Sequence, residues 1–310
     1  MDQGEQKMMP YKTILAMAGI LLVSACVENP ATVGSRGKPF QFPATDESII
    51  VETDPSKTGD PDDGLAARLL EKSNVDVLLV SATDGNVPIG RALENARELW
   101  PDHLVIPAAD NCNSELVRAY REQLRQQKLT VLALGSLRNI AMVLECHPDL
   151  APRINELIVV AGRKPGEEFW LNPERKVMRP MRDLNYETDR GAMVTVMRTR
   201  VRITLIPFAA GNAVRILPHN LRGIPEDERQ RVVDHAATLW VVGGGWTIPP
   251  FDLVAAAYLI SPEAFSCENV RMEAGDELVL EKVDQSRNQL CLPSNPDRLR
   301  SIMLSVLNSE

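Results

Sequence analysis

Four aspartates gather within ten residues near the start of the chain, at positions 54, 60, 62 and 63. They follow a short β-branched run, residues 48–53, and open a stretch with helical leucine spacing. Carboxylates that converge on one crevice repel each other unless they are protonated or bound to a cation. Because carboxylate oxygens without His or Cys suit Ca²⁺ or Mg²⁺, the cluster predicts a divalent metal site.

A well-capped helix explains three of these acids without any function. Asp60 suits the N-cap, Pro61 suits the first helical position, and Asp62 and Asp63 suit the positive end of the helix dipole. Asp54 does not fit this alternative, because it stands at the end of the strand-like run. On these residues alone, the metal site and the capped helix both remain open.

Strand-like and helix-like segments alternate along most of the chain. The expected strands are 48–53, 76–82, 104–106, 130–134, 155–161 and 201–207, and the expected helices are 61–72, 89–100, 114–127, 137–145 and 252–259. This order predicts an α/β fold: a mainly parallel central sheet, open and doubly wound, flanked by helices. The apolar strands lack alternation, as strands covered on both faces do. We expect one domain over residues 48–310, with its ligand crevice at the carboxyl ends of the strands.

The first 47 residues are predicted to be a targeting signal followed by a tether. Residues 13–25 are apolar or small. This run is too short to cross a bilayer, which needs about 20 such residues, and a short apolar run near the N-terminus is typical of a signal peptide. Its end, Val23-Ser24-Ala25-Cys26, resembles the bacterial lipoprotein lipobox. The resemblance implies a signal peptide over 1–25, a tether over 26–47, and membrane attachment through a lipid on Cys26. We therefore expect a periplasm-facing protein, lipid-anchored in the bacterial cell envelope; an ordinary secretory signal or a buried helix is the alternative.

Net charge and cysteine content limit which binding partners and metals we expect. The net charge is −8, from 34 basic and 42 acidic residues, so a nucleic-acid polymer is not expected to bind. Cys267 and Cys291 flank a strand-like stretch and would either form a disulfide or stand as isolated thiols. No Cys-x-x-Cys or His-x-x-x-His pattern supports zinc. Self-association into a homo-oligomer stays open.

Several short motifs follow one another in an order known from one family. They are Glu52-Thr-Asp54-Pro, Asp62-Asp63-Gly-Leu-Ala, Gly85-Asn86 with Asn95, Gly-Ser-Leu-Arg-Asn-Ile-Ala after the strand-like run 130–134, Asp183-Leu-Asn185-Tyr with Asp189, and Phe251-Asp252. From Ile49 to about Phe265 the chain resembles the nucleoside hydrolase family, inosine-uridine preferring type. The resemblance implies hydrolysis of the N-glycosidic bond of ribonucleosides or related ribosides.

The resemblance also implies roles for individual residues. Ca²⁺ would be held by Asp54, Asp63, Asp252 and the backbone carbonyl of Leu134, with Asp54 as the base that deprotonates water. The ribose hydroxyls would be held by Asp62, Asn86, Asp183, Asn185 and Asp252. These residue types suit a reaction that passes through a ribosyl cation-like state.

The sequence departs from the family pattern at three places. Nine residues rather than five separate Asp54 from Asp63, so Asp60 competes with Asp54 as a ligand. Asp183 replaces a longer Glu, and Phe251 replaces the His that usually protonates a purine leaving group. No His of this chain lies in a matching motif, and all four, at positions 103, 147, 219 and 235, are expected at the surface or in packing.

Two other functions remain open at this stage. One is a nucleoside- or ribose-binding envelope lipoprotein with weakened catalysis, motivated by Phe251 and Asp183. The other is a Mg²⁺-dependent phosphohydrolase with Asp54 as nucleophile, which lacks the expected second Asp two residues away. Four aromatic residues could stack on a base or simply pack in the core: Trp170, Tyr186, Trp246 and Phe251. The glycines 243–245 suggest a loop over the site or a plain connector.

Overall fold

The central sheet confirms the expected α/β architecture. The computed structural model describes residues 48–57, 60–172, 174, 176, 180–242 and 245–309, and within them nine strands form one sheet in the order β3-β2-β1-β4-β5-β6-β9-β7-β8. The strands are β1 (Ser48–Thr53), β2 (Asp76–Ala82), β3 (Val105–Ile106), β4 (Leu129–Ala133), β5 (Ile154–Val159), β6 (Ile203–Leu205), β7 (Phe265–Ala274), β8 (Leu278–Lys282) and β9 (Gln289–Pro293). Neighbours from β3 to β9 pair in parallel, whereas β7 and β8 are antiparallel.

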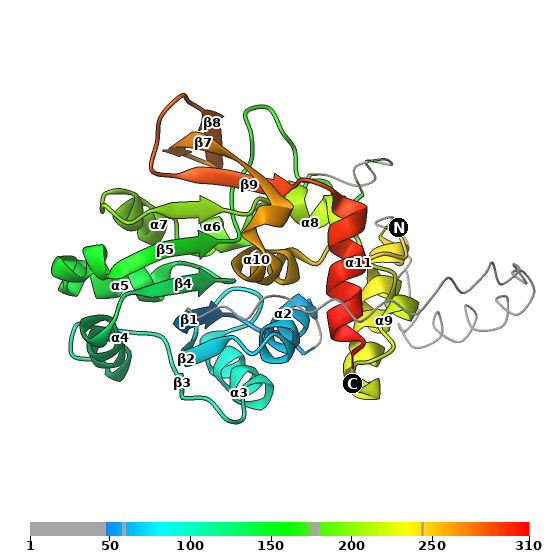
Figure 1. Cartoon of the computed structure of the whole chain (residues 1–310), viewed down its shortest axis with the longest axis horizontal. Coiled ribbons are helices and arrows are strands. Elements are labelled where there is room, and N and C mark those ends of the chain that lie inside the picture. The colour runs from blue at the N-terminus through cyan, green and yellow to red at the C-terminus, as the bar shows by residue number, and fades with distance from the viewer. Residues whose placement is uncertain are drawn as a thin grey trace, which may run out of the picture. The chain divides into compact units, whose positions relative to one another are not determined.

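Helices cover both faces of this sheet (Figure 1). They are α2 (Asp62–Lys72), α3 (Ile89–Leu99), α4 (Glu115–Gln126), α5 (Arg138–Cys146), α6 (Leu184–Thr188), α7 (Arg190–Met197), α8 (Phe208–Val214), α9 (Glu226–Val241), α10 (Phe251–Ile260) and α11 (Pro296–Leu307), with 3-10 turns η1 (Pro148–Arg153), η2 (Pro218–Asn220) and η3 (Pro262–Ala264). Ile49 and Val51 of β1 pack into the core formed with α2, α10 and α11. Ile50 faces the opposite core, formed with α4, α5 and α7. Burial on both faces explains why the strand is apolar without alternation.

The C-terminal part differs from the expectation. The stretch between Cys267 and Cys291 reads as one strand-like run, but it contains the β7–β8 hairpin and leads into β9. The chain reverses at Gly275 and Asp276, a turn dipeptide inside an otherwise β-prone segment. Strand β9 then pairs in parallel with β6, so the last three strands extend the sheet rather than forming a separate layer.

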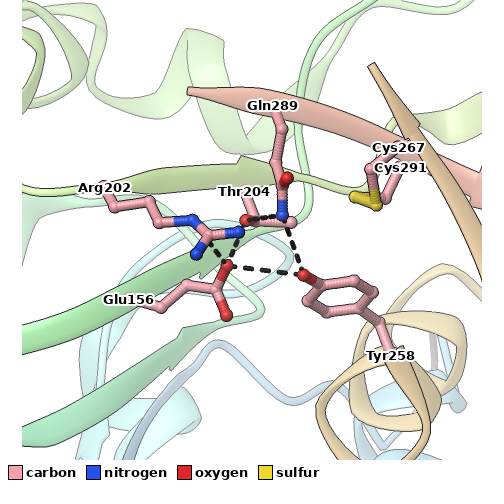
Figure 2. Close-up of a disulfide and its surroundings, with 7 residues drawn as sticks. All are labelled: Glu156, Arg202, Thr204, Tyr258, Cys267, Gln289 and Cys291. Carbon is pink, nitrogen blue, oxygen red and sulfur yellow. Dashed lines mark hydrogen bonds and ion pairs between the residues drawn. A yellow bond between two sulfur atoms is a disulfide. The ribbon is translucent and has the colours of Figure 1, made fainter. Parts of the chain in front are cut away.

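A disulfide fixes this extension, as Figure 2 shows. Cys267 of β7 and Cys291 of β9 are paired partners in the sheet and are bonded, which decides between the two readings of the sequence. Beside it, the amide of Gln289 donates hydrogen bonds of 2.9 Å to both Thr204 and Tyr258. A second disulfide, Cys112–Cys146, ties the turn before α4 to the end of α5.

The N-terminal predictions lie outside the described residues. The signal peptide over 1–25, the lipidated Cys26 and the tether over 26–47 all fall before residue 48, where the described chain begins. Within the described ranges, no helix is long and apolar enough to span a membrane.

The strand order places a crevice at one defined point. The chain passes from β1 outward to β2 and β3, and then returns to the other side of β1 with β4. In an open α/β sheet this reversal leaves a crevice beyond the carboxyl ends of the two central strands. Asp54 comes directly after β1, and Leu134 and Gly135 come directly after β4. The fold therefore brings the first predicted site residue to its switch point.

Candidate active site

Asp54 is buried in a cradle of backbone. Its side chain is 1% exposed, and the backbone N–H of Asn86 donates a 2.6 Å hydrogen bond to Oδ2. A Cβ added at Gly85 would lie 2.0 Å from Oδ2, and one at Gly135 would lie 2.8 Å from Oδ1. Glycine is therefore required at both positions for the backbone to approach the carboxylate so closely. Oδ1 has no hydrogen-bond partner among the described residues, although it is buried.

Three more acids converge beside Asp54. Asp62 and Asp63 stand in the first turn of α2, and Asp252 stands in the first turn of α10. One carboxylate oxygen from each lies within 4.8 Å of the others, and all three residues are buried. The helices α2 and α10 pack side by side, and the backbone N–H of Asp252 donates a 3.0 Å hydrogen bond to Oδ2 of Asp62. The structure thus joins acids from both ends of the predicted domain.

The electrostatics of this cluster favour a bound cation. Burial raises the pKa of Asp62, Asp63 and Asp252 well above the usual range, and the charges of neighbouring acids raise it further. At Asp62, a hydrogen bond with the Asp60 carboxyl also raises the pKa. Burial raises the pKa of Asp54 to about 7. Oδ2 of Asp63 is buried without a hydrogen-bond partner among the described residues, like Oδ1 of Asp54. Unpartnered carboxylate oxygens from these two acids fit the ligand set of a hard divalent cation.

Asn185 ties together two of the strand ends around the crevice. Its side-chain amide donates hydrogen bonds of 2.7 Å to the carbonyl of Leu134 and 2.9 Å to the carbonyl of Val160. The Leu134 carbonyl, expected as a metal ligand, therefore already accepts one hydrogen bond. A carbonyl oxygen has two lone pairs, so a second partner is still accommodated.

Both carboxylate oxygens of Asp183 accept hydrogen bonds from backbone N–H groups, which the sequence does not indicate. Its Oδ2 accepts a 2.6 Å hydrogen bond from the N–H of Gly162, and its Oδ1 accepts a 3.2 Å bond from the N–H of Tyr186. The carboxylate caps α6, while burial raises its pKa. Asp183 still lines the cavity described next, so it can contact a ligand only through its remaining lone pairs.

A cavity of about 440 Å³ opens beside these residues. One part of its lining is polar. It consists of seven residues that were predicted for the site or considered as alternatives, with Leu134 contributing its backbone carbonyl: Asp60, Asp62, Asn86, Leu134, Asp183, Asn185 and Asp252. Asp54 and Asp63 do not line it and lie behind this wall. The volume falls in the range of small-molecule sites, roughly 300–1,000 Å³. A ligand in the cavity would meet Asp62 and Asp252 directly.

The apolar part of the cavity contains three phenylalanines, and the sequence motifs pointed only to Phe251 among them. Phe169 stacks on Phe208 with ring centroids 4.3 Å apart and meets Phe251 edge-on at 5.4 Å. Of the four aromatic residues expected as stacking candidates, only Phe251 lines the cavity, whereas Tyr186 is buried elsewhere. A Cβ at Gly211 would lie 2.4 Å from the Phe251 ring, so α8 leaves room for this ring only at a glycine.

Asp60 and His235 correct two expectations. Asp60 does not cap α2, because Pro61 occupies the N-cap and no side chain caps this helix end. Oδ1 of Asp60 instead lies 3.9 Å from Nε2 of His235 on α9. His235 lines the cavity rather than the outer surface or the core. The structure therefore does not support helix capping by Asp60. Asp60 and Asp54 are both outside the group of three converging acids, so the competition between them as metal ligands stays a prediction.

Comparisons with known proteins agree with this geometry. The sequence profile of the inosine-uridine preferring nucleoside hydrolases matches residues 103–291, more than half of the chain. The non-specific ribonucleoside hydrolase RihC of Escherichia coli O1:K1 is 26% identical in an alignment covering 70% of this chain and 80% of that protein. RihC of Salmonella paratyphi A is 24% identical, covering 71% and 81%.

Solved structures share the fold. A plant nucleoside hydrolase superposes with a TM-score of 0.70 at 16% identity, covering 85% of this chain and 99% of that one. A purine-preferring ribonucleoside hydrolase from Gardnerella vaginalis gives 0.71 at 13% identity, covering 84% and 98%. The segment with Asp54, Asp62 and Asp63 precedes the range matched by the profile, which fits its lengthened loop. Profile, sequence relatives and fold together show that the chain belongs to the inosine-uridine preferring nucleoside hydrolase family.

Proposed function

We propose that this protein hydrolyses ribonucleosides or related ribosides with the help of bound calcium. The observation that carries the proposal is the convergence of Asp62, Asp63 and Asp252 beside the buried Asp54, next to a cavity large enough for a nucleoside. Membership of the family supports cleavage of the N-glycosidic bond. It gives no support to the phosphohydrolase alternative.

The polar wall of the cavity suits the sugar. Asp62, Asn86, Asp183, Asn185 and Asp252 line it together and would accept or donate hydrogen bonds to the ribose hydroxyls. Carboxylates placed there also add negative potential near a ring that becomes positive as the bond to the base breaks. The phenylalanine wall would then enclose the base.

Acids in this wall and behind it suit the cation. Asp54, Asp63 and Asp252 would hold calcium together with the carbonyl of Leu134. When bound, calcium supplies positive charge that orients the attacking water and lowers its pKa. Calcium acidifies water weakly, so Asp54 is needed as the base that accepts the proton. Its fixed position between two glycines keeps the carboxylate aimed at one point.

A binding protein with weakened catalysis is the second candidate. Phe251 occupies the position from which the family usually protonates a purine, and both oxygens of Asp183 accept backbone hydrogen bonds. Such a protein would bind nucleosides without turnover.

One assay separates the candidates: reducing-sugar release from a panel of purine and pyrimidine nucleosides, with and without a chelator. We expect release that stops on chelation and returns with added Ca²⁺. Isothermal calorimetry that shows nucleoside binding without sugar release would favour the binding protein. Activity that a chelator leaves unchanged would contradict the calcium role.

We further propose that the mature protein is anchored in the bacterial cell envelope by a lipid on Cys26 and faces the periplasm. The lipobox-like Val23-Ser24-Ala25-Cys26 supports this. Mass spectrometry of the membrane-extracted protein should show an N-terminal Cys26 carrying the lipid mass, and an unmodified Cys26 would contradict it.

A further inference from the structure

His235 lines the cavity next to Asp60 of its polar part and to the apolar side chain of Leu239. It lies on α9, and Thr238, Leu239 and the C-cap residue Val242 line the cavity with it. These positions follow at spacings of three and four, which places them on one helix face. The side chain of His235 is 17% exposed, so it is largely enclosed yet accessible from the cavity.

The reaction needs a proton donor for the leaving base. When the bond between C1′ and the base nitrogen breaks, its electron pair goes to the base, and a purine or pyrimidine anion leaves poorly unless it is protonated. Six of the described residues that line the cavity carry titratable side chains: Asp60, Asp62, Asp183, Arg182, His235 and Asp252. The carboxyls of Asp62, Asp183 and Asp252 belong to the sugar wall.

Three groups remain: Arg182, Asp60 and His235. The Asp60 carboxyl shares a hydrogen bond with Asp62 of the sugar wall. Arg182 holds its proton too tightly, and its exposed side chain is paired with Glu187. An imidazole donates a proton readily near neutral pH. We propose that His235 protonates the leaving nucleobase and that Asp60 positions it, an inference that rests on the proposed nucleoside hydrolysis.

Asp60 supplies what such a donor needs. Its Oδ1 lies 3.9 Å from Nε2 of His235, and an opposite charge at this distance favours the imidazolium form. The imidazolium charge of His235 would also lower the pKa of the Asp62 carboxyl, against the larger effect of burial. On α9 itself, Arg231 one turn away is paired with Asp227, and Asp234 is exposed. The charges around His235 are therefore mainly negative.

The lengthened loop and Phe251 are then two parts of one change. Asp60 stands in the lengthened interval between Asp54 and Asp63 and lies beside His235 of α9, while the family's usual donor position holds Phe251. Phe251 joins Phe169 and Phe208 in the apolar wall. Proton donation has moved from the start of α10 to α9, and the old position now contributes to the apolar enclosure.

The step balances in atoms and electrons. The oxygen of water forms a bond to C1′ while one of its protons passes to Asp54. The bond from C1′ to the base nitrogen breaks, its electron pair stays on the base, and the base takes the proton of the His235 imidazolium. Asp54 then loses its proton to solvent, and His235 regains one, so one water is consumed and ribose and neutral base are released.

His235→Gln tests the proposal with two substrates that differ in the leaving group. On inosine we expect kcat/KM to fall by about 10²–10⁴-fold, the usual contribution of a general acid. On 4-nitrophenyl β-D-ribofuranoside we expect a loss below about tenfold, because nitrophenolate leaves without a proton. The wild-type inosine profile should decline at alkaline pH as the imidazolium is lost, and the variant should lack this decline. His219→Gln, an exposed histidine on η2, is the matched control and should behave as wild type.

Asp60→Asn provides a second test that does not remove the imidazole. Without the negative charge, the alkaline decline on inosine should move to lower pH, while cleavage of the nitrophenyl riboside changes little. An unmoved decline would overturn the positioning role of Asp60. Equal losses on both substrates in a folded His235→Gln protein, or no loss on inosine, would overturn the donor role.

Failure of the underlying function looks different. A wild-type protein that cleaves neither substrate in the presence of Ca²⁺ overturns the proposed hydrolase and this inference with it. A wild-type protein that cleaves both, with Asp54→Asn inactive on both and His235→Gln equal to wild type, overturns the inference alone.

Discussion

The backbone N–H of Asp252 donates a 3.0 Å hydrogen bond to Oδ2 of Asp62, joining residues 190 positions apart. This contact docks the start of α10 against the start of α2 and brings two helix N-termini to one acidic cluster. The positive ends of both helix dipoles then face the carboxylates. Such ends partly offset the mutual repulsion of the acids, and a divalent cation would offset the rest.

Asp54→Asn should separate catalysis from folding. Removing the base should lower kcat on nucleosides by about 10²–10⁴-fold. Calorimetry should also show weaker Ca²⁺ binding. The fold should persist, because Asn is nearly isosteric and removes a buried charge. Unchanged sugar release, with circular dichroism confirming the fold, would contradict the role of Asp54.

Stability without metal should fall as the pH rises. Burial raises the pKa of Asp54 to about 7 in the folded protein, above its usual value near 4 when unfolded. A raised carboxyl pKa contributes stability that is complete below about pH 4 and is lost as the pH rises through about 7. The apoprotein should therefore melt several degrees lower at pH 8 than at pH 5.

Calcium should reverse this trend. Added Ca²⁺ should raise the melting temperature strongly at pH 8 and little at pH 5, because protonated acids compete with the cation. Differential scanning calorimetry at both pH values, with chelator and with Ca²⁺, measures both effects. An equal Ca²⁺ effect at both pH values would argue against binding at these acids.

Gly85→Ala should damage the site through a single methyl group. The added Cβ would lie 2.0 Å from Oδ2 of Asp54, so the carboxylate or the loop must shift. We expect a loss of at least tenfold in kcat and a destabilisation of about 1–3 kcal/mol, typical of overpacking. Gly90→Ala on α3 is the control, since nothing lies within 4 Å of its Cβ, and should keep activity and stability.

Loss of the Cys267–Cys291 disulfide should affect stability but not chemistry. Cys267 lies in β7 and Cys291 in β9, and neither residue lines the cavity. For a sequence separation of 24 residues, the constraint on the unfolded chain is worth about 3 kcal/mol. Cys267→Ser with Cys291→Ser should lower the denaturation midpoint by a corresponding amount, while kcat at 25 °C stays within about twofold. A large loss of kcat in the folded variant would reveal coupling between this edge and the site.

The fold was largely predictable because its signals are local. Apolar runs such as 130–134 and helices with leucine spacing give the alternation, and the alternation determines the parallel sheet. The β7–β8 hairpin was missed because one Gly-Asp turn inside a continuous β-prone run is a weak signal. Cys112–Cys146 was missed because nothing in the sequence places two cysteines 34 residues apart in contact.

The site was predictable where a motif carries it and not where contacts alone do. Asp54, Asp62 and Asp252 meet as the family pattern implies, although their roles remain predictions. The contact between Asp60 and His235 could not be predicted, because an aspartate before a helix is equally well explained as a helix cap. Phe169, Phe208 and His235 come from segments without motifs, and only the packing of α8 and α9 around the cavity brings them together.

The long sequence separation between Asp62 and Asp252 has a consequence for when the proposed cation site can form. A chain that emerges from synthesis contains most of the sheet before α10 exists, and its early aspartates then lack their partner from that helix. Under the proposed calcium role, tight binding of the ion must wait for the last third of the polypeptide, so the ion would stabilise the complete protein and not truncated chains.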